Sequence, residues 1–168
     1  MTLLPFVARR RPRTLALASL LALAAASSFA QDRFKVSGDG QEVLDTSTRL
    51  TWRRCPEGMQ WAGQTCAGKA AKFSFAGAKK ALATTATGAA AWRIPSREEL
   101  LGLVDKTAKK KPRIDGAAFP KTPSTLFWAT RAGSDDDLNA WLVSFANGKV
   151  IGNSGQAKFP LRLVRTGG

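Results

Sequence analysis

The sequence has no histidine and no tyrosine, and only two of its 168 residues are cysteine. Without histidine, the chain cannot form a Ser-His-Asp triad, a Cys-His dyad or a histidine metal site. Two cysteines are too few for a four-cysteine zinc site, or for an iron–sulfur cluster held by this chain alone. These absences exclude most familiar catalytic centres, so we expect a protein that is not an enzyme and has neither a cofactor nor a metal.

Negative charge is also scarce. The chain has 12 acidic residues against 26 lysines and arginines, which gives a net charge of +14. Four of the arginines lie within the first thirty residues, so residues 31–168 carry 22 basic and 12 acidic residues and a net charge of +10. An excess of this size favours polyanionic partners, which are nucleic acid, anionic membrane surfaces, or sulfated and phosphorylated glycans.

The first thirty residues have the pattern of a secretory signal peptide. An arginine cluster precedes an apolar run from Leu15 to Ala26, and small residues before Gln31 predict cleavage after Ala30. The apolar run has 12 residues, whereas a membrane-spanning helix needs about 20. We therefore expect residues 1–30 to be removed, and residues 31–168 to form one soluble domain that is periplasmic or secreted.

Export changes the interpretation of the two cysteines, Cys55 and Cys66, which are separated by ten residues. In an oxidising compartment, such a pair predicts one structural disulfide. A redox-active pair usually has two intervening residues and a lowered thiol pKa. The spacing therefore favours the structural bridge, which would stabilise the fold by about 2–3 kcal/mol in the chain-entropy model.

Hydrophobic spacing and turn residues predict the secondary structure. A helix is expected over residues 74–83 with Ser74 as its N-cap. A second helix follows Ser96, because Ser96 and Glu99 have the spacing of a capping box. Asn147-Gly148 predicts a hairpin turn. The predicted strands cover residues 34–36, 42–44, 50–53, 127–130, 141–145, 149–151 and 161–165. Two helices among many short strands predict an α+β domain.

A lysine-rich run provides the first candidate binding site. It places five cations within eight residues: Lys106, Lys109, Lys110, Lys111 and Arg113. We predict that these residues bind sulfate or phosphate groups of an anionic ligand, with a strong dependence on salt. The alternative is a solvated loop after a helix end, where cations are also favourable.

The sequence also contains a second set of basic residues. It consists of Arg53, Arg54, Lys69, Lys72, Lys79 and Lys80. The sequence does not show whether this set shares one surface with the lysine-rich run. Arg162 and Arg165 near the C-terminus have a different interpretation, because one of them is expected to pair inward with an acid such as Asp45 or Asp115.

Among the tryptophans, Trp61 is the candidate for an exposed ring, because it lies among polar and glycine residues between the two cysteines. We include Trp61 in the predicted ligand-binding set. The other four have apolar neighbours and are predicted to be core residues. They are Trp52, Trp92, Trp128 and Trp141.

A run of acids, Asp135 to Asp137, together with Asn139 offers hard oxygen ligands of the kind that calcium prefers. The spacing matches no calcium loop that we know, and like charges in an exposed turn are common. The exposed turn is therefore the favoured interpretation, and no metal site is predicted.

Several motifs in order resemble one protein family. Along the chain they are Asp45-x-x-Thr48-x-Leu50-x-Trp52, Cys55-Pro56-x-Gly58-x-x-Trp61-x-Gly63-x-x-Cys66, Trp92-Arg93-Ile94-Pro95-Ser96-x-x-Glu99-Leu100, Ala140-Trp141-x-Val143-x-Phe145-x-x-Gly148 and Arg162-Leu163-Val164-Arg165. The series resembles the Lcl C-terminal domain family, named for the Legionella collagen-like adhesin, over residues 34–165. The resemblance implies an exported bacterial domain with a C-type-lectin-like α+β fold. The adhesin that gives the family its name binds sulfated glycosaminoglycans.

We therefore expect an exported, non-enzymatic binding module that captures an anionic glycan or another envelope polyanion through its basic loops. The alternative is an envelope protein that binds another protein, with the positive charge serving only solubility. An aspartate-based hydrolase is a third hypothesis. Nucleic acid fits the charge, but it is a less natural partner for an exported chain.

Overall fold

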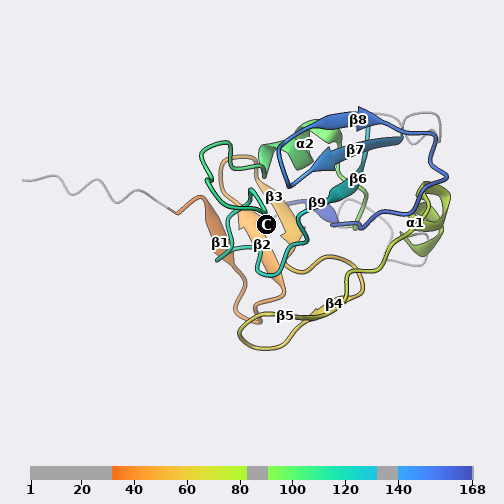
Figure 1. The fold of residues 1–168 in the computed structure, drawn as a ribbon. Coiled ribbons are helices and arrows are strands. Elements are labelled where there is room, and N and C mark those ends of the chain that lie inside the picture. Colours follow the sequence, from red (N-terminus) through yellow and green to blue (C-terminus); the bar gives the residue numbers. More distant parts are fainter. Residues whose placement is uncertain (1–31, 83–90, 132–139, 168) are drawn as a thin grey trace, which may run out of the picture. The chain divides into compact units, whose positions relative to one another are not determined.

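Two antiparallel sheets dominate the computed structural model, which describes residues 32–82, 91–131 and 140–167 (Figure 1). The described residues all belong to the unit Gln31–Gly168. The expected signal and the acidic run near Asp135 lie outside them. In the part of the chain that is described, no helix has the length and apolar character needed to cross a membrane.

The first sheet joins the beginning and the end of the described chain (Figure 1). Its strand order is β1-β2-β3-β9, and each neighbouring pair is antiparallel. In the register, Trp52 lies between Val43 on one side and Val164 on the other, and all three are buried. The strands are β1 (Phe34–Val36), β2 (Glu42–Asp45), β3 (Leu50–Arg53) and β9 (Val164–Thr166).

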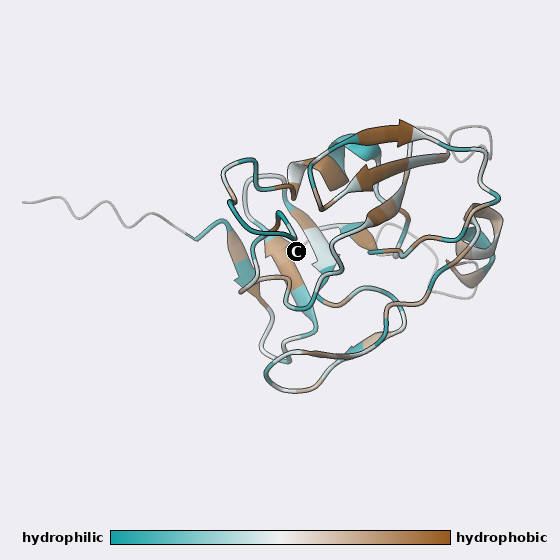
Figure 2. Cartoon of the chain, viewed as in Figure 1, coloured by the Kyte–Doolittle hydropathy of each residue, from teal (hydrophilic) through white to brown (hydrophobic). Residues whose placement is uncertain are grey.

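The second sheet buries side chains on both faces, because successive residues of a strand point to opposite sides. Phe127 and Val143 enter one hydrophobic cluster, whereas Trp128 and Leu142 enter another. The sheet therefore links two cores, and Figure 2 shows it as one of the most hydrophobic parts of the ribbon. Its antiparallel strands are β6 (Leu126–Thr130), β7 (Ala140–Ser144) and β8 (Val150–Gly152).

Two short helices, α1 (Phe75–Leu82) and α2 (Arg97–Gly102), start at the predicted caps. Ser74 Oγ accepts from the amide of Gly77, and Ser96 Oγ accepts from the amide of Glu99 at 3.1 Å. Glu99 reaches back to the Ser96 amide at 2.7 Å and also binds Arg93. Burial by itself would raise the pKa of Glu99, but the hydrogen bonds from Arg93 and Ser96 outweigh it and lower the pKa. The capping box is thus confirmed.

The structure confirms the α+β prediction and differs from the sequence-based elements in two places. A hairpin of β4 (Met59–Trp61) and β5 (Cys66–Gly68) begins after Cys55 and includes Cys66, where we predicted only a loop. The last strand begins at Val164 and not at residue 161. The reason is that the carbonyl groups of Pro160 and Leu161 accept from the amides of Trp128 and Glu57, which lie outside the ladder between β3 and β9.

Candidate functional site

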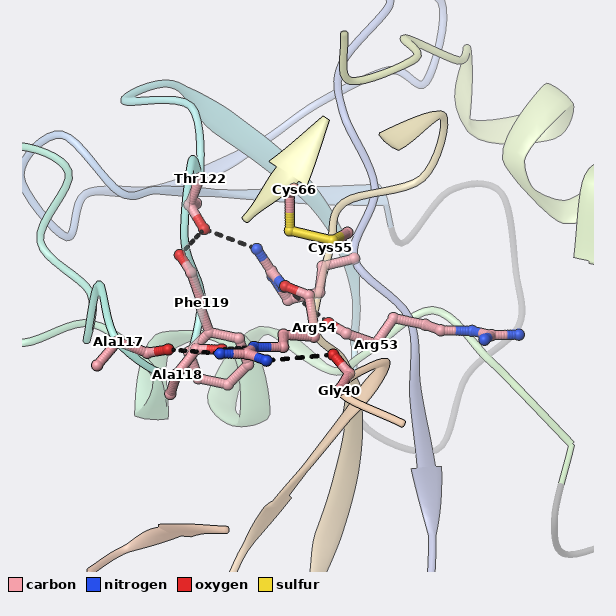
Figure 3. Close-up of a disulfide and its surroundings, with 10 residues drawn as sticks. Gly40, Arg53, Arg54, Cys55, Cys66, Ala117, Ala118, Phe119 and Thr122 are labelled. Atoms are coloured by element: carbon pink, nitrogen blue, oxygen red, sulfur yellow. Dashed lines mark hydrogen bonds between the residues drawn. A yellow bond between two sulfur atoms is a disulfide. The ribbon is translucent and has the colours of Figure 1, made fainter. Parts of the chain in front are cut away.

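The predicted disulfide between Cys55 and Cys66 is present, with an S–S distance of 2.04 Å (Figure 3). Both cysteines are buried. The bond connects the end of β3 to the start of β5, so it fixes the β4–β5 hairpin against the first sheet. Two cavities on the described surface have residues of this hairpin in their lining.

The side chain of Arg162 has no solvent exposure. Its guanidinium donates to the carbonyl of Arg53 at 2.7 Å, to the carbonyl of Arg54, and to Thr122 Oγ1 at 2.7 Å. Burial lowers the pKa of Arg162 to about 9, opposed by the charge of Glu57. The guanidinium is therefore charged at neutral pH, and it holds three chain segments together.

The prediction that Arg162 or Arg165 pairs with Asp45 or Asp115 is wrong. Arg162 points inward, but it binds carbonyl and hydroxyl oxygens. Arg165 instead pairs with Glu42 across the sheet at 2.7 Å.

The two aspartates have partners closer in the chain. Asp45 binds Arg33, which β1–β2 pairing brings next to it. Asp115 accepts from the amides of Ala117 and Ala118 in its own turn. Both carboxylates therefore have hydrogen-bond partners other than the two C-terminal arginines.

Arg54, from the second basic set, is also a structural residue (Figure 3). Its guanidinium donates to three backbone carbonyls, those of Gly40, Ala117 and Ala118, over 3.0 to 3.3 Å. The same guanidinium lies over the indole of Trp61, 3.8 Å from the ring centroid. Arg54 thus connects the β1–β2 turn, the segment before Phe119 and the hairpin.

Trp61, the candidate for an exposed ring, is half-buried, so the ring is only partly accessible. A Cβ atom at Gly40 would lie 2.3 Å from the indole Nε1, which shows how closely that backbone packs against the ring. Trp61 lines a cavity of about 510 Å³ that we call the tryptophan pocket. Its other lining residues are Asp39, Gln41, Arg53, Cys55, Glu57, Met59 and Gln60.

Of the other tryptophans, Trp52 and Trp128 are core residues as predicted, with exposures of 1% and 0%. Trp92 and Trp141 are only partly buried. Trp92 lies beneath the guanidinium groups of two arginines, and Trp141 beneath one. Arginine side chains therefore cover the tryptophans that the cores leave partly open.

The lysine-rich run is an ordered loop. Asp105 accepts from the amides of Thr107 and Ala108, and Arg113 is anchored through backbone bonds to Asp105 and Phe145. The side chains of Lys109, Lys110 and Lys111 are exposed.

Lys106 has mixed surroundings. It lines a cavity of about 690 Å³ together with Arg33 and three acids, which are Asp32, Asp105 and Asp115. Trp61 lines a different cavity, so the structure does not bring Trp61 and Lys106 into one pocket.

Three other lysines surround a cavity of about 630 Å³, which we call the lysine pocket. They are Lys69 and Lys72, after β5, and Lys121, in the segment before β6. The lining includes Ser124 and Thr125 but no acidic residue. Sequence analysis placed Lys69 and Lys72 in the second basic set but missed Lys121, because that residue has no basic neighbour in the sequence.

Lys121 has a left-handed backbone, with φ of 55°. This conformation is uncommon for a residue other than glycine and needs support from its surroundings. The support comes from the next residue: Thr122 donates to the carbonyl of Phe119 at 2.8 Å and accepts from Arg162. The buried arginine therefore fixes the turn that carries Lys121.

The Lcl C-terminal domain family matches residues 41–165 of the chain. This chain belongs to the Lcl C-terminal domain family. No curated protein and no solved structure matches it. Membership indicates an adhesin-associated binding module, and every residue that lines the lysine pocket of this Lcl C-terminal domain lies within the matched region.

The described part of the Lcl C-terminal domain contains no group of three or more metal-ligating side chains. The acidic run near Asp135, considered above as a calcium site, lies outside the described residues.

Proposed function

We propose that this Lcl C-terminal domain is an exported, non-enzymatic module that captures anionic glycans or other polyanions of the cell envelope. The observation that carries the proposal is the lysine pocket, where three lysines from two separate segments of the chain line one cavity without a carboxylate. The proposal includes the signal peptide that the sequence predicts and the C-type-lectin-like fold that the family resemblance implies.

Electrostatics explains why this cavity suits an anion. A lysine ammonium is a compact point charge, so three of them around one cavity attract a sulfate or phosphate group from any direction. The hydroxyl groups of Ser124 and Thr125 add neutral hydrogen-bond donors. By contrast, the acids beside Lys106 weaken the attraction in the larger cavity.

The lysine-rich run keeps a role in this proposal. Lys109, Lys110 and Lys111 are exposed on an ordered loop, with Lys106 and Arg113 at its two ends. We propose that they contact further charges of a long polyanion and speed its association. Such contacts weaken as salt increases, because the mobile ions screen exposed charges.

The test is binding of the exported protein to immobilised heparin and to an uncharged dextran surface over a salt series. Two triple variants remove equal charge: K69E/K72E/K121E in the lysine pocket, and K109E/K110E/K111E in the loop. We expect salt-sensitive binding to heparin, and a loss of roughly tenfold or more for the pocket variant. The loop variant should lose less.

Two outcomes would contradict this proposal in different ways. Equal losses in the two variants would mean that net charge and not the lysine pocket governs capture. Absence of heparin binding by the unaltered protein would reject polyanion capture, and would turn attention to the hypothesis of a protein partner.

A further inference from the structure

We infer that the tryptophan pocket is a second, separate binding site, which takes an uncharged sugar ring. Its volume of about 510 Å³ lies in the usual range of small-molecule sites. The pocket shares only Met59 with the lysine pocket, and no lysine lines it. The inference therefore does not depend on the function proposed above.

The aromatic wall of this pocket is held in place before any ligand arrives. Arg54 covers the indole of Trp61 and is itself fixed by three backbone carbonyls. The backbone at Gly40 packs against the pyrrole edge of the same ring. A ring that is already immobile loses little conformational entropy on binding. A sugar can then place its C–H groups against an aromatic surface that needs no reorganisation.

The polar lining supplies both donors and acceptors. Gln41 and Gln60 are exposed, and each primary amide both donates and accepts. The side-chain carboxylate of Glu57 has no hydrogen bond or ion pair within the described residues, and burial raises its pKa despite the nearby charges of Arg53 and Arg162. Sugar hydroxyl groups also donate and accept, so they match this mixture.

The charges in the pocket argue against the other ligand classes. Two carboxylates, Asp39 and Glu57, line it, so a sulfated or phosphorylated group would meet repulsion. A cationic ligand is disfavoured as well, because the guanidinium of Arg54 already lies on the indole and Arg53 lines the same cavity. A neutral ring with several hydroxyl groups avoids both penalties.

The experiment measures binding of the exported protein to uncharged hexasaccharides of β-linked glucose, N-acetylglucosamine, mannose and galactose by isothermal calorimetry. We expect binding to at least one of them that is insensitive to salt. Trp61→Ala should weaken it roughly tenfold or more. Because that variant removes a packed ring, the double variant Q41A/Q60A tests the site without touching the indole, and it should weaken binding severalfold.

Two controls separate this site from its surroundings. Trp141→Ala removes another half-buried indole, which lies beneath Arg97 and outside the pocket, and it should leave sugar binding unchanged. The variant K69E/K72E/K121E should also bind the sugar as tightly as the unaltered protein does, while its affinity for heparin falls. The inference is overturned if none of the hexasaccharides binds, if Q41A/Q60A and Trp61→Ala both bind as well as the unaltered protein, or if tetramethylammonium binds in their place.

Discussion

Arg162 and Thr122 are joined side chain to side chain in the interior, with 2.7 Å between Nη2 of the arginine and Oγ1 of the threonine. The other amino group of Arg162 binds the carbonyls of Arg53 and Arg54 at the end of β3. One buried guanidinium thus connects the strand that leads to the disulfide with the turn that presents Lys121. The stability of the fold and the shape of the lysine pocket depend on the same residue.

Replacing Arg162 by methionine should therefore be strongly destabilising. The variant keeps an apolar chain of similar length, but leaves two carbonyl groups and one hydroxyl without their donor. A buried polar group left unpaired costs about 1–3 kcal/mol, so we expect a loss of about 3 kcal/mol or more in the free energy of unfolding. Urea denaturation measures it. Arg165→Met is the control: both side chains of its ion pair with Glu42 are partly exposed, and its loss should cost about 1 kcal/mol or less.

The disulfide should stabilise the hairpin that separates the two pockets. Cys55 lines the tryptophan pocket and Cys66 lines the lysine pocket. Removing both with C55A/C66A should lower the free energy of unfolding by about 2–4 kcal/mol, because the unfolded chain regains freedom. The unaltered protein, unfolded in urea with a reducing agent, should match the double variant. Equal stability of the oxidised protein and C55A/C66A would contradict a structural role for the bond.

Gly40 has a conformation and a neighbour that exclude a side chain. Its φ is 73°, and a Cβ atom there would lie 2.3 Å from Nε1 of Trp61. The left-handed backbone alone costs a non-glycine residue about 1–2 kcal/mol, so Gly40→Ala should destabilise the protein by about 2 kcal/mol or more and weaken sugar binding. Gly38→Ala is the matched control in the same turn, because nothing lies within 4 Å of the place that its Cβ atom would take. Its stability should stay within about 0.5 kcal/mol of the unaltered protein.

The contributions of Asp45 and Glu57 to stability should change with pH in opposite directions. Asp45 is 1% exposed; burial would raise its pKa, but hydrogen bonds from Arg33 and Ser47 outweigh this and lower it. The folded state therefore binds fewer protons than the unfolded state. The stability from Asp45 is complete above the unfolded pKa of about 3.9 and is lost as the pH falls through the folded pKa. In Asp45→Asn this acid-dependent loss should be smaller, and the protein should be less stable at neutral pH.

Glu57 behaves in the opposite way, because burial raises its pKa and the folded state then binds more protons. Its contribution is most favourable below the unfolded pKa of about 4.3 and is lost as the pH rises through the higher folded pKa. Glu57→Gln should remove this loss and make the protein more stable at neutral pH. Urea unfolding between about pH 3 and pH 7 measures both variants. A stability loss at neutral pH in Glu57→Gln would show that attraction to Arg53 and Arg162 outweighs the burial of the carboxyl group.

Features encoded by neighbouring residues could be predicted from the sequence. The capping box of Ser96 and Glu99 needs only residues three apart, and the hydrogen bonds form as predicted. The turn at Asn147-Gly148 follows the same principle, with Gly148 at a φ of 78° and Asn147 accepting from the amide of Lys149. The disulfide was also predicted, from the expected export to an oxidising compartment and from the ten residues between the two cysteines. These three features depend on residues that lie close together in the sequence, so the sequence by itself determined them.

The tertiary structure decided everything that depends on segments far apart in the chain. Lys69 and Lys121 share a cavity because the disulfide, the β4–β5 hairpin and the buried Arg162 bring their segments together. Trp61 and Gln41, which are far apart in the sequence, also line one pocket. The number of basic residues predicted attraction to anions, but it did not reveal which lysines would gather without acids around them. The packing of the two cores sets the distances between those lysines, and residue spacing along the sequence does not predict these distances.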